Sequence, residues 1–170
     1  MKELIGVDLF DLIQDNRFDA LCITTNCSVN MDGTNPMGGG CAGAAARRWE
    51  SMPLRLGHFL LNAPNVPCCL GYIDPMSDDL RDPGHPLFLG RHVAIWAFPT
   101  MPSIGEPASL DLVARSASLM MEVADAFGFE GIAVPRMGAG IGGLNWEKEV
   151  KPVVEKIFDD RFYAVHKDGK

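Results

Sequence analysis

Short apolar runs alternate with segments of helical periodicity along the whole chain. Apolar and β-branched residues gather in the pattern of buried strands at 3–8, 20–25, 66–73, 92–98, 131–134 and 161–165. Between these runs the clearest helix is predicted for 109–127, where Leu110, Val113, Ala117 and Met120 fall on one face. Alternation of this kind predicts an α/β fold built in layers.

The other predicted helices are shorter. One turn is expected at 10–14, and 38–49 continues from glycines into alanines and arginines, which favour helix. A last helix carries an apolar face from Trp146 to Phe158. Pro152 would break its middle, so its regular part is expected to begin near Val150.

Two polar stretches, 26–36 and 74–90, predict long surface loops. A loop as long as the second is commonly functional or mobile, and we expect one of these roles for 74–90. Neither a linker nor a low-complexity segment interrupts the pattern, and 170 residues suit one domain. We therefore expect a single domain spanning 1–170.

The composition is that of a folded intracellular protein. Hydrophobic residues make up 47% of the chain and charged residues 22%, which is enough for a core and argues against disorder. No apolar run approaches the length of a membrane span, and the N-terminal residues do not form a signal peptide. Together these features predict a cytoplasmic protein that does not interact with membranes.

The cysteines and histidines give no pattern of a metal or redox site. No pair has C-x-x-C spacing among Cys22, Cys27, Cys41, Cys68 and Cys69, so we expect reduced structural thiols. Cys68 and Cys69 are neighbours in a predicted strand, and their side chains should point to opposite faces. The histidines are scattered without ligand spacing. We expect neither a metal ion nor a cofactor.

The net charge of −7 argues against nonspecific binding of nucleic acid, which normally requires a basic surface. An anionic ligand would therefore have to be held locally, by backbone N–H groups and helix ends.

Two glycine-rich segments provide such groups. They are MGGGCAG at 37–43 and MGAGIGG at 137–143, and both satisfy G-x-G-x-x-G. Glycine permits a positive φ and close approach of a ligand, and successive N–H groups then form a nest for an anion. One such segment alone fits a plain turn equally well. The Rossmann interpretation fails, because neither segment directly follows the first strand.

These residues resemble the macro domain family. The stretch ITTNCSVNMDGTNPMGGGCAG at 23–43 looks like the first signature of that family, and VPRMGAGIGGLNW at 134–146 resembles the second loop of its bacterial and viral Appr-1″-p processing branch. FPT at 98–100 and DDRF at 159–162 fit the same branch, so the resemblance covers nearly the whole chain. It implies a three-layer α/β/α sandwich around a mixed sheet of about six strands, with ADP-ribose or a derivative as ligand.

The resemblance also assigns residues to the ligand. Asp8 matches the acid that accepts a hydrogen bond from the adenine amino group, and Asn26 matches an Asn near the distal ribose. The resemblance implies that the adenine pocket is lined by Leu9 and Phe10. It also implies that the ribose and phosphates are contacted by the residues of the two loops: Gly38, Gly39, Gly40, Cys41, Gly138, Ala139, Gly140, Ile141 and Gly142.

Structural roles remain open for several of these positions. Asp8 also suits a helix N-cap, and Asn26 also suits a residue that fixes the turn after its strand. Asn35 precedes a proline and is expected in turn chemistry, yet it is close enough to the first loop to contact a ligand. We expect Arg136 to pair with a buried carboxylate or to shape its loop, and Trp146 to pack in the core.

Three function classes follow. The first is an enzyme that hydrolyses ADP-ribose-1″-phosphate or ADP-ribosyl groups, with Asn26 and Asn35 as the candidate catalytic residues that orient water. The family's acidic or aromatic side chain is missing at Gly142, and Ala139 replaces a hydroxyl or thiol. The second class is a module that sequesters ADP-ribose or a signalling nucleotide made from NAD. The third is RNA binding, which the net charge opposes.

Overall fold

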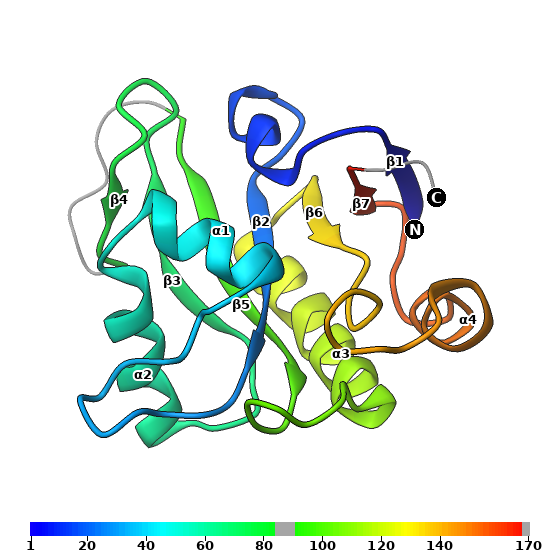
Figure 1. Cartoon of the computed structure of the whole chain (residues 1–170). Helices are drawn as coiled ribbons and strands as arrows, with labels where there is room; N and C mark the ends of the chain where they lie inside the picture. Colours follow the sequence, from blue (N-terminus) through cyan, green and yellow to red (C-terminus); the bar gives the residue numbers. More distant parts are fainter. Residues whose placement is uncertain (84–90, 168–170) are drawn as a thin grey trace.

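The computed structural model describes residues 1–83 and 91–167, in which seven strands form one mixed sheet (Figure 1). The strands are β1 Lys2–Ile5, β2 Ala20–Asn26, β3 Cys68–Ile73, β4 Leu80–Arg81, β5 Val93–Met101, β6 Ile132–Pro135 and β7 Phe162–His166. Their order across the sheet is β1-β7-β6-β2-β5-β3-β4. In this order, the strands β1, β7, β6, β2 and β5 are parallel to one another. The strand β3 is antiparallel to both of its neighbours, β5 and β4.

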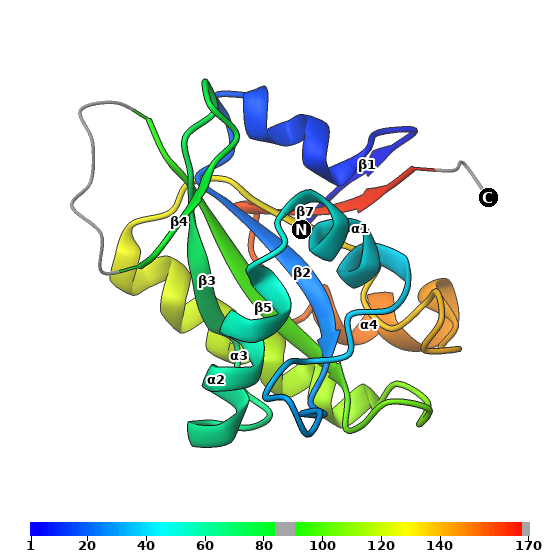
Figure 2. The same ribbon diagram turned by 60° about the vertical axis from the view of Figure 1, so that its left-hand side comes forward.

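Helices cover both faces of the sheet. The helical segments are the 3₁₀ helix η1 Leu9–Gln14, α1 Gly40–Arg48, α2 Met52–Asn62, α3 Leu110–Phe127, the π-helical segment η2 Trp146–Val150 and α4 Lys151–Val154. The segments η1, α1 and α2 pack on one face, while α3, η2 and α4 pack on the other (Figure 2). The expected three-layer α/β/α architecture is confirmed.

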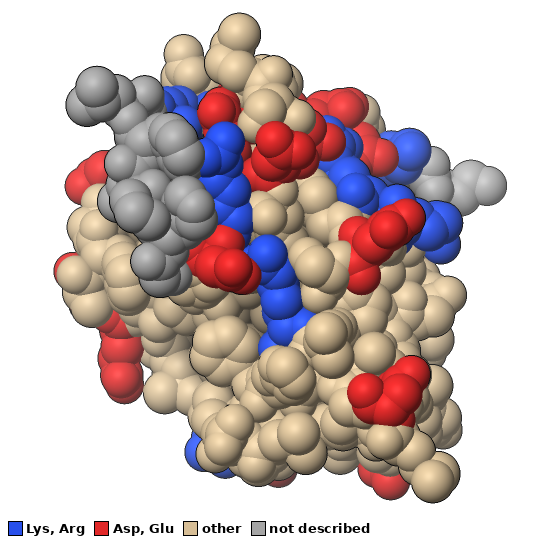
Figure 3. All heavy atoms as spheres, turned by 90° about the vertical axis from the view of Figure 1, so that its left-hand side faces the viewer, with Lys and Arg blue, Asp and Glu red and all other residues tan. Residues whose placement is uncertain are grey.

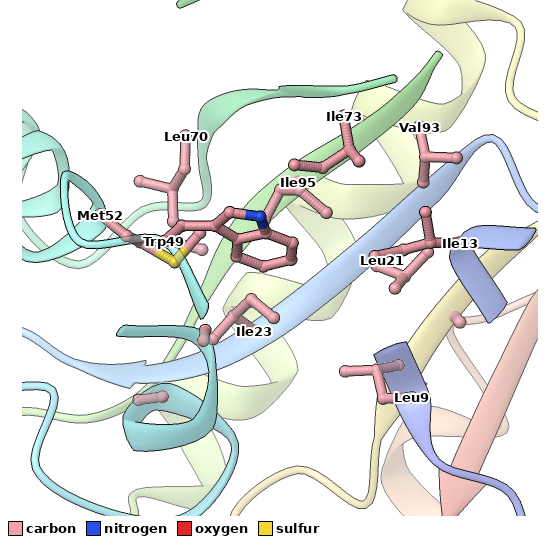
Figure 4. Close-up of a cluster of buried hydrophobic side chains, with 14 of the residues drawn as sticks. Leu9, Ile13, Leu21, Ile23, Trp49, Met52, Leu70, Ile73, Val93 and Ile95 are labelled. Carbon is pink, nitrogen blue, oxygen red and sulfur yellow. The ribbon is translucent and has the colours of Figure 1, made fainter. Parts of the chain in front are cut away.

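The alternation of side chains along β2 supplies both halves of the core. Leu21 and Ile23 point into the layer beneath α1 and α2, where they meet Trp49 and Ile95 (Figure 4). Ala20 and Cys22 point into the layer beneath α3. Cys68 and Cys69 divide between the same two layers, as their neighbouring positions in one strand predict.

The sheet has seven strands rather than about six. The additional strand, β4, consists of two residues inside the stretch expected to be a loop, and it pairs with β3. So short a strand has no periodicity that a sequence pattern can reveal. The part of that stretch from 84 to 90 lies outside the described residues.

The long helix and the last helix follow their sequence signals. Ser109 caps α3 by accepting a hydrogen bond from the Leu112 N–H, and Gly128 ends it in the left-handed conformation. Pro152 lies in the first turn of α4, so the regular helix begins next to Val150 as expected. None of the described helices has the length and apolar character required to cross a membrane.

The topology creates a crevice at one edge of the sheet. Neighbouring parallel strands β2 and β6 end at the same edge, but the chain after β2 enters α1 on one face while the chain after β6 enters η2 on the other. Where connections diverge in this way, α/β folds bind ligands beyond the carboxyl ends of their strands.

Candidate functional site

A cavity of about 1210 Å³ lies at this carboxyl edge. Its volume slightly exceeds the usual range for small-molecule sites and suits a nucleotide with two sugars. The cavity is lined by Asn26 and by every residue predicted to bind the ligand: Asp8, Leu9, Phe10, Gly38, Gly39, Gly40, Cys41, Gly138, Ala139, Gly140, Ile141 and Gly142. Asn35, the other candidate catalytic residue, does not line it.

The first glycine-rich loop leads directly into α1. Gly39 is the N-cap residue and brings no side chain to satisfy the first N–H groups of the helix. Gly40 has a φ of 55°, a left-handed conformation that glycine adopts without strain. The N–H groups of 40–42 donate to no acceptor in the described part of the chain. They are therefore available to an anionic group in the cavity.

The second glycine-rich loop follows β6 and makes a tight turn. Gly138 and Gly143 have φ values of 73° and 79°, and the Leu144 N–H closes the turn on the Gly138 carbonyl at 3.0 Å. The N–H groups of 140–142 meet no acceptor among the residues that the structure describes. All three residues line the cavity, so they provide a second set of donors opposite the first.

The side chain of Ile141 links the two loops. Its Cδ1 lies 2.7 Å from the point where a Cβ on Gly39 would stand, and 3.5 Å from the same point on Gly40. The side chain nevertheless remains 72% exposed. The loops are therefore close enough to contact one diphosphate from both sides.

Asp8 lies where η1 and the end of β7 meet the cavity, and both of its carboxylate oxygens are engaged. Oδ2 accepts a hydrogen bond from Lys167 Nζ at 3.0 Å, and Oδ1 accepts one from the Phe10 N–H at 2.9 Å. The ammonium of Lys167 and then the Phe10 N–H hold the pKa of Asp8 below its ordinary value. The alternative role of Asp8 as an N-cap is thus observed. Each carboxylate oxygen can still accept a further bond from a ligand.

Asn26 and Asn35 form one hydrogen-bonded unit. Asn26 Oδ1 accepts from the Ser28 N–H at 2.9 Å, and its Nδ2 donates to the Pro36 carbonyl at 3.2 Å, so this side chain does fix the turn after β2. Asn35 is 2% exposed and donates to both oxygens of Asn26 and to the Ser28 carbonyl. Asn35 therefore holds Asn26 in position through hydrogen bonds, and of these two residues only Asn26 lines the cavity.

A cluster around Glu3 supports the second loop. Glu3 accepts hydrogen bonds from Lys151 Nζ at 2.7 Å and from Trp146 Nε1 at 3.0 Å, and it pairs with Arg136 at 3.5 Å. The bond from Lys151 is the main cause of a lowered Glu3 pKa, although partial burial opposes it. Trp146 thus packs in the core as expected, and Arg136 pairs with a carboxylate, although that carboxylate is only partly buried. Both residues also line the cavity.

The cavity offers few groups for acid–base or nucleophilic chemistry. Burial raises the pKa of the Cys41 thiol to about 12, so this cysteine is protonated near neutral pH and is a poor nucleophile. The described residues contain no group of three or more His, Cys, Asp or Glu side chains that could hold a metal ion. The carboxylates in the lining are those of Asp8 and Glu106.

Sequence reasoning missed part of the lining. The lining also includes His166 and Lys167, and five residues near the end of β5: Met101, Ile104, Gly105, Glu106 and Pro107. These residues lie at or just after the ends of β5 and β7. The only signal for them in the sequence was the predicted end of each strand, because parallel strands end at a common edge of the sheet. His166 Nδ1 is buried without a hydrogen-bond partner among the described residues.

Figure 3 shows how charge is distributed on the face toward α2 and β4. Basic side chains on this face alternate with acidic ones. Ion pairs between such side chains include Arg48–Asp78 at 2.8 Å and Arg55–Asp82 at 2.7 Å. This face therefore has no broad basic field.

Solved structures of macrodomains resemble this chain over its length. The macrodomain of Mycobacterium tuberculosis DarG is 22% identical, with 96% of this chain and 97% of that chain covered and a TM-score of 0.65. The macrodomain of Thermus aquaticus DarG is 20% identical, with 96% and 98% covered and a TM-score of 0.66. Thermosipho africanus DarTG, solved in complex with ADP-ribose, is 15% identical, with 98% and 42% covered and a TM-score of 0.74.

The chain therefore has the macrodomain fold, as its two glycine-rich loops predicted. No protein-family model matches the sequence, and a search of curated proteins finds no match either.

Proposed function

We propose that this protein binds ADP-ribose or an ADP-ribose derivative. The observation that carries the proposal is that two sets of backbone N–H groups, 40–42 and 140–142, line one cavity and have no acceptor among the described residues. In this arrangement the diphosphate lies between the loops, the adenine lies near Asp8 and Phe10, and the distal ribose lies near Asn26. Backbone donors also explain how a chain of net charge −7 can hold an anion.

Two structural neighbours support the choice of ligand. Thermosipho africanus DarTG was solved with ADP-ribose, and a Trypanosoma brucei macrodomain was solved with ADP. The same ligand is proposed for this chain because of its two glycine-rich loops. These loops would bind the diphosphate through backbone N–H groups and do not depend on particular side chains.

Calorimetric titration with ADP-ribose tests the proposal. A Cβ on Gly140 would meet no atom within 4 Å, so Gly140→Glu should fold normally and place a carboxylate in the phosphate site. We expect micromolar binding by the native protein and a loss of at least about tenfold in the variant, equivalent to about 1.4 kcal/mol.

Ser118→Glu adds the same charge on the exposed side of α3 and should leave binding unchanged. Absence of binding by the native protein would contradict the proposal, and the signalling nucleotides derived from NAD would then be titrated in the same way.

Hydrolysis at the distal ribose is a second candidate function. The lining includes both Asn26 and residues of the segment 101–107, beside which the group attached to the distal ribose would lie. The expected reactions are removal of the 1″-phosphate or of ADP-ribose from a modified group. Release of ADP-ribose by the native protein, lost in Asn26→Ala, would support an enzyme over a module that only sequesters the nucleotide.

A further inference from the structure

The segment 102–107 is fastened to the site at both of its ends. At its start, the Met101 carbonyl accepts from the Cys27 N–H at 3.1 Å, and the Ile104 N–H donates to Ser28 Oγ at 2.8 Å. At its end, the Ala108 N–H donates to the Gly142 carbonyl at 2.9 Å. The segment therefore spans from the turn that holds Asn26 to the second glycine-rich loop, beside the place proposed for the distal ribose.

The second loop itself has no space for a side chain at this point. A Cβ on Gly142 would stand 2.6 Å from the Ala108 Cβ and 2.8 Å from the Gly138 carbonyl oxygen. Backbone cannot yield to such a contact without moving the loop. Position 142 therefore supplies no reactive side chain at this end of the cavity, and the neighbouring segment is the place to look for a carboxylate.

Glu106 is the side chain of that segment with suitable chemistry. It is exposed, it lines the cavity, and the described part of the chain gives its carboxylate neither a hydrogen bond nor an ion pair. The other carboxylate of the lining, Asp8, is held by Lys167 and the Phe10 N–H. Glu106 is thus the lining carboxylate that has no such partner among the described residues.

We propose that Glu106 is the general base for hydrolysis of O-linked ADP-ribosyl groups, an inference that rests on the proposed binding of ADP-ribose. Its carboxylate accepts a proton from a water molecule whose oxygen attacks C1″ of the distal ribose. The bond from C1″ to the acceptor oxygen breaks, and its electron pair remains on that oxygen, which takes a proton from solvent. The products are ADP-ribose with a C1″ hydroxyl and the free acceptor, and Glu106 returns its proton to solvent.

The test compares native protein with Glu106→Gln on two probes, ADP-ribose-1″-phosphate and a peptide carrying ADP-ribose on a serine. Release of the acceptor is measured as kcat and KM, and ADP-ribose affinity is measured in parallel. General-base catalysis contributes about 100-fold or more, so kcat should fall by at least that factor while KM and the ADP-ribose Kd stay within about threefold. Glu106→Asp should keep part of the activity.

Glu155→Gln removes an exposed carboxylate outside the cavity and should behave as native protein. Native turnover in Glu106→Gln would overturn the assignment. So would a native protein that binds ADP-ribose but releases neither acceptor. A native protein that fails to bind ADP-ribose would refute the proposed function itself.

Discussion

At the scale of single residues, the contact between Gly39 and Ile141 decides how the two loops meet. A methyl group on Gly39 would stand 2.7 Å from Ile141 Cδ1, which is the far end of a flexible side chain. We therefore expect Gly39→Ala to leave the fold intact but to displace Ile141 toward the ligand. The displaced side chain would take up space between the two loops, so ADP-ribose affinity should fall by about tenfold in calorimetry, equivalent to about 1.4 kcal/mol.

A double-mutant cycle separates this contact from other effects of the methyl group. In the Ile141→Ala background the methyl has nothing to displace, and Gly39→Ala should change affinity by less than about threefold. Equal losses in both backgrounds would show that the two residues act independently.

The residues show how far the sequence could specify the site. The two loops were identified from their glycine spacing, and Gly40, Gly138 and Gly143 do have positive φ values, which glycine adopts without strain. The sequence did not reveal that Asn35 positions Asn26, because this role depends on a fold that brings the two side chains to within 3.0 Å. Glu106 was missed for a similar reason, since an exposed glutamate in a loop has no distinctive pattern.

At the scale of elements, α2 supports the site from outside. It packs against the polar loop 26–36, and the Asn35 N–H donates to the Pro53 carbonyl at 2.8 Å. Gly57 makes this packing possible, because a Cβ there would stand 1.8 Å from the Gly33 carbonyl oxygen. The helix thus holds the loop that in turn holds Asn26.

Gly57→Ala should therefore destabilise the protein, although alanine is the better helix former by about 1 kcal/mol. We expect the free energy of unfolding in urea to fall by at least about 2 kcal/mol, because backbone must move to admit the methyl group. His58→Ala changes an exposed neighbour in the same helix and should be close to neutral. A stabilising Gly57→Ala would mean that α2 and the loop do not pack as described.

The helices and strands also show why the hydrophobic pattern predicted some elements and missed others. The strands β2 and β5 and the helix α3 have enough buried positions to repeat their period several times. The helix α2 was not anticipated, since its outer side carries the exposed apolar residues Leu54, Phe59 and Leu61, which blur the contrast between its faces. The strand β4 is too short for any period.

At the scale of the whole molecule, Glu3 ties the first strand to the last third of the chain. The strand β1 has four residues at an edge of the sheet and pairs only with β7 among the described strands. Glu3 adds contacts to Trp146 and Lys151, which lie on the opposite face from η1. Since β1 leads directly to Asp8, this cluster also holds the adenine end of the proposed site in place.

Acid should weaken this connection. The folded-state pKa of Glu3 is lowered, mainly by the hydrogen bond from Lys151, so its ionised form stabilises the fold above the unfolded pKa near 4.5. That contribution disappears as the pH falls through the lower folded pKa, where the carboxylate takes up a proton. The free energy of unfolding should therefore decline below about pH 5, and Glu3 should account for part of the slope.

Glu3→Gln isolates that part, because it preserves the size of the side chain and removes its charge. At pH 7 the variant should be less stable by about 2 kcal/mol, the usual range for hydrogen bonds to a charged group. The difference should shrink as native Glu3 becomes protonated, so urea unfolding curves of the two proteins should converge toward pH 3. Glu155 has no such partner among the described residues, so Glu155→Gln should give a curve parallel to that of the native protein. A constant difference between native protein and Glu3→Gln at every pH would instead assign the loss to packing around Trp146, and the ionic link between β1 and the C-terminal helices would have to be abandoned.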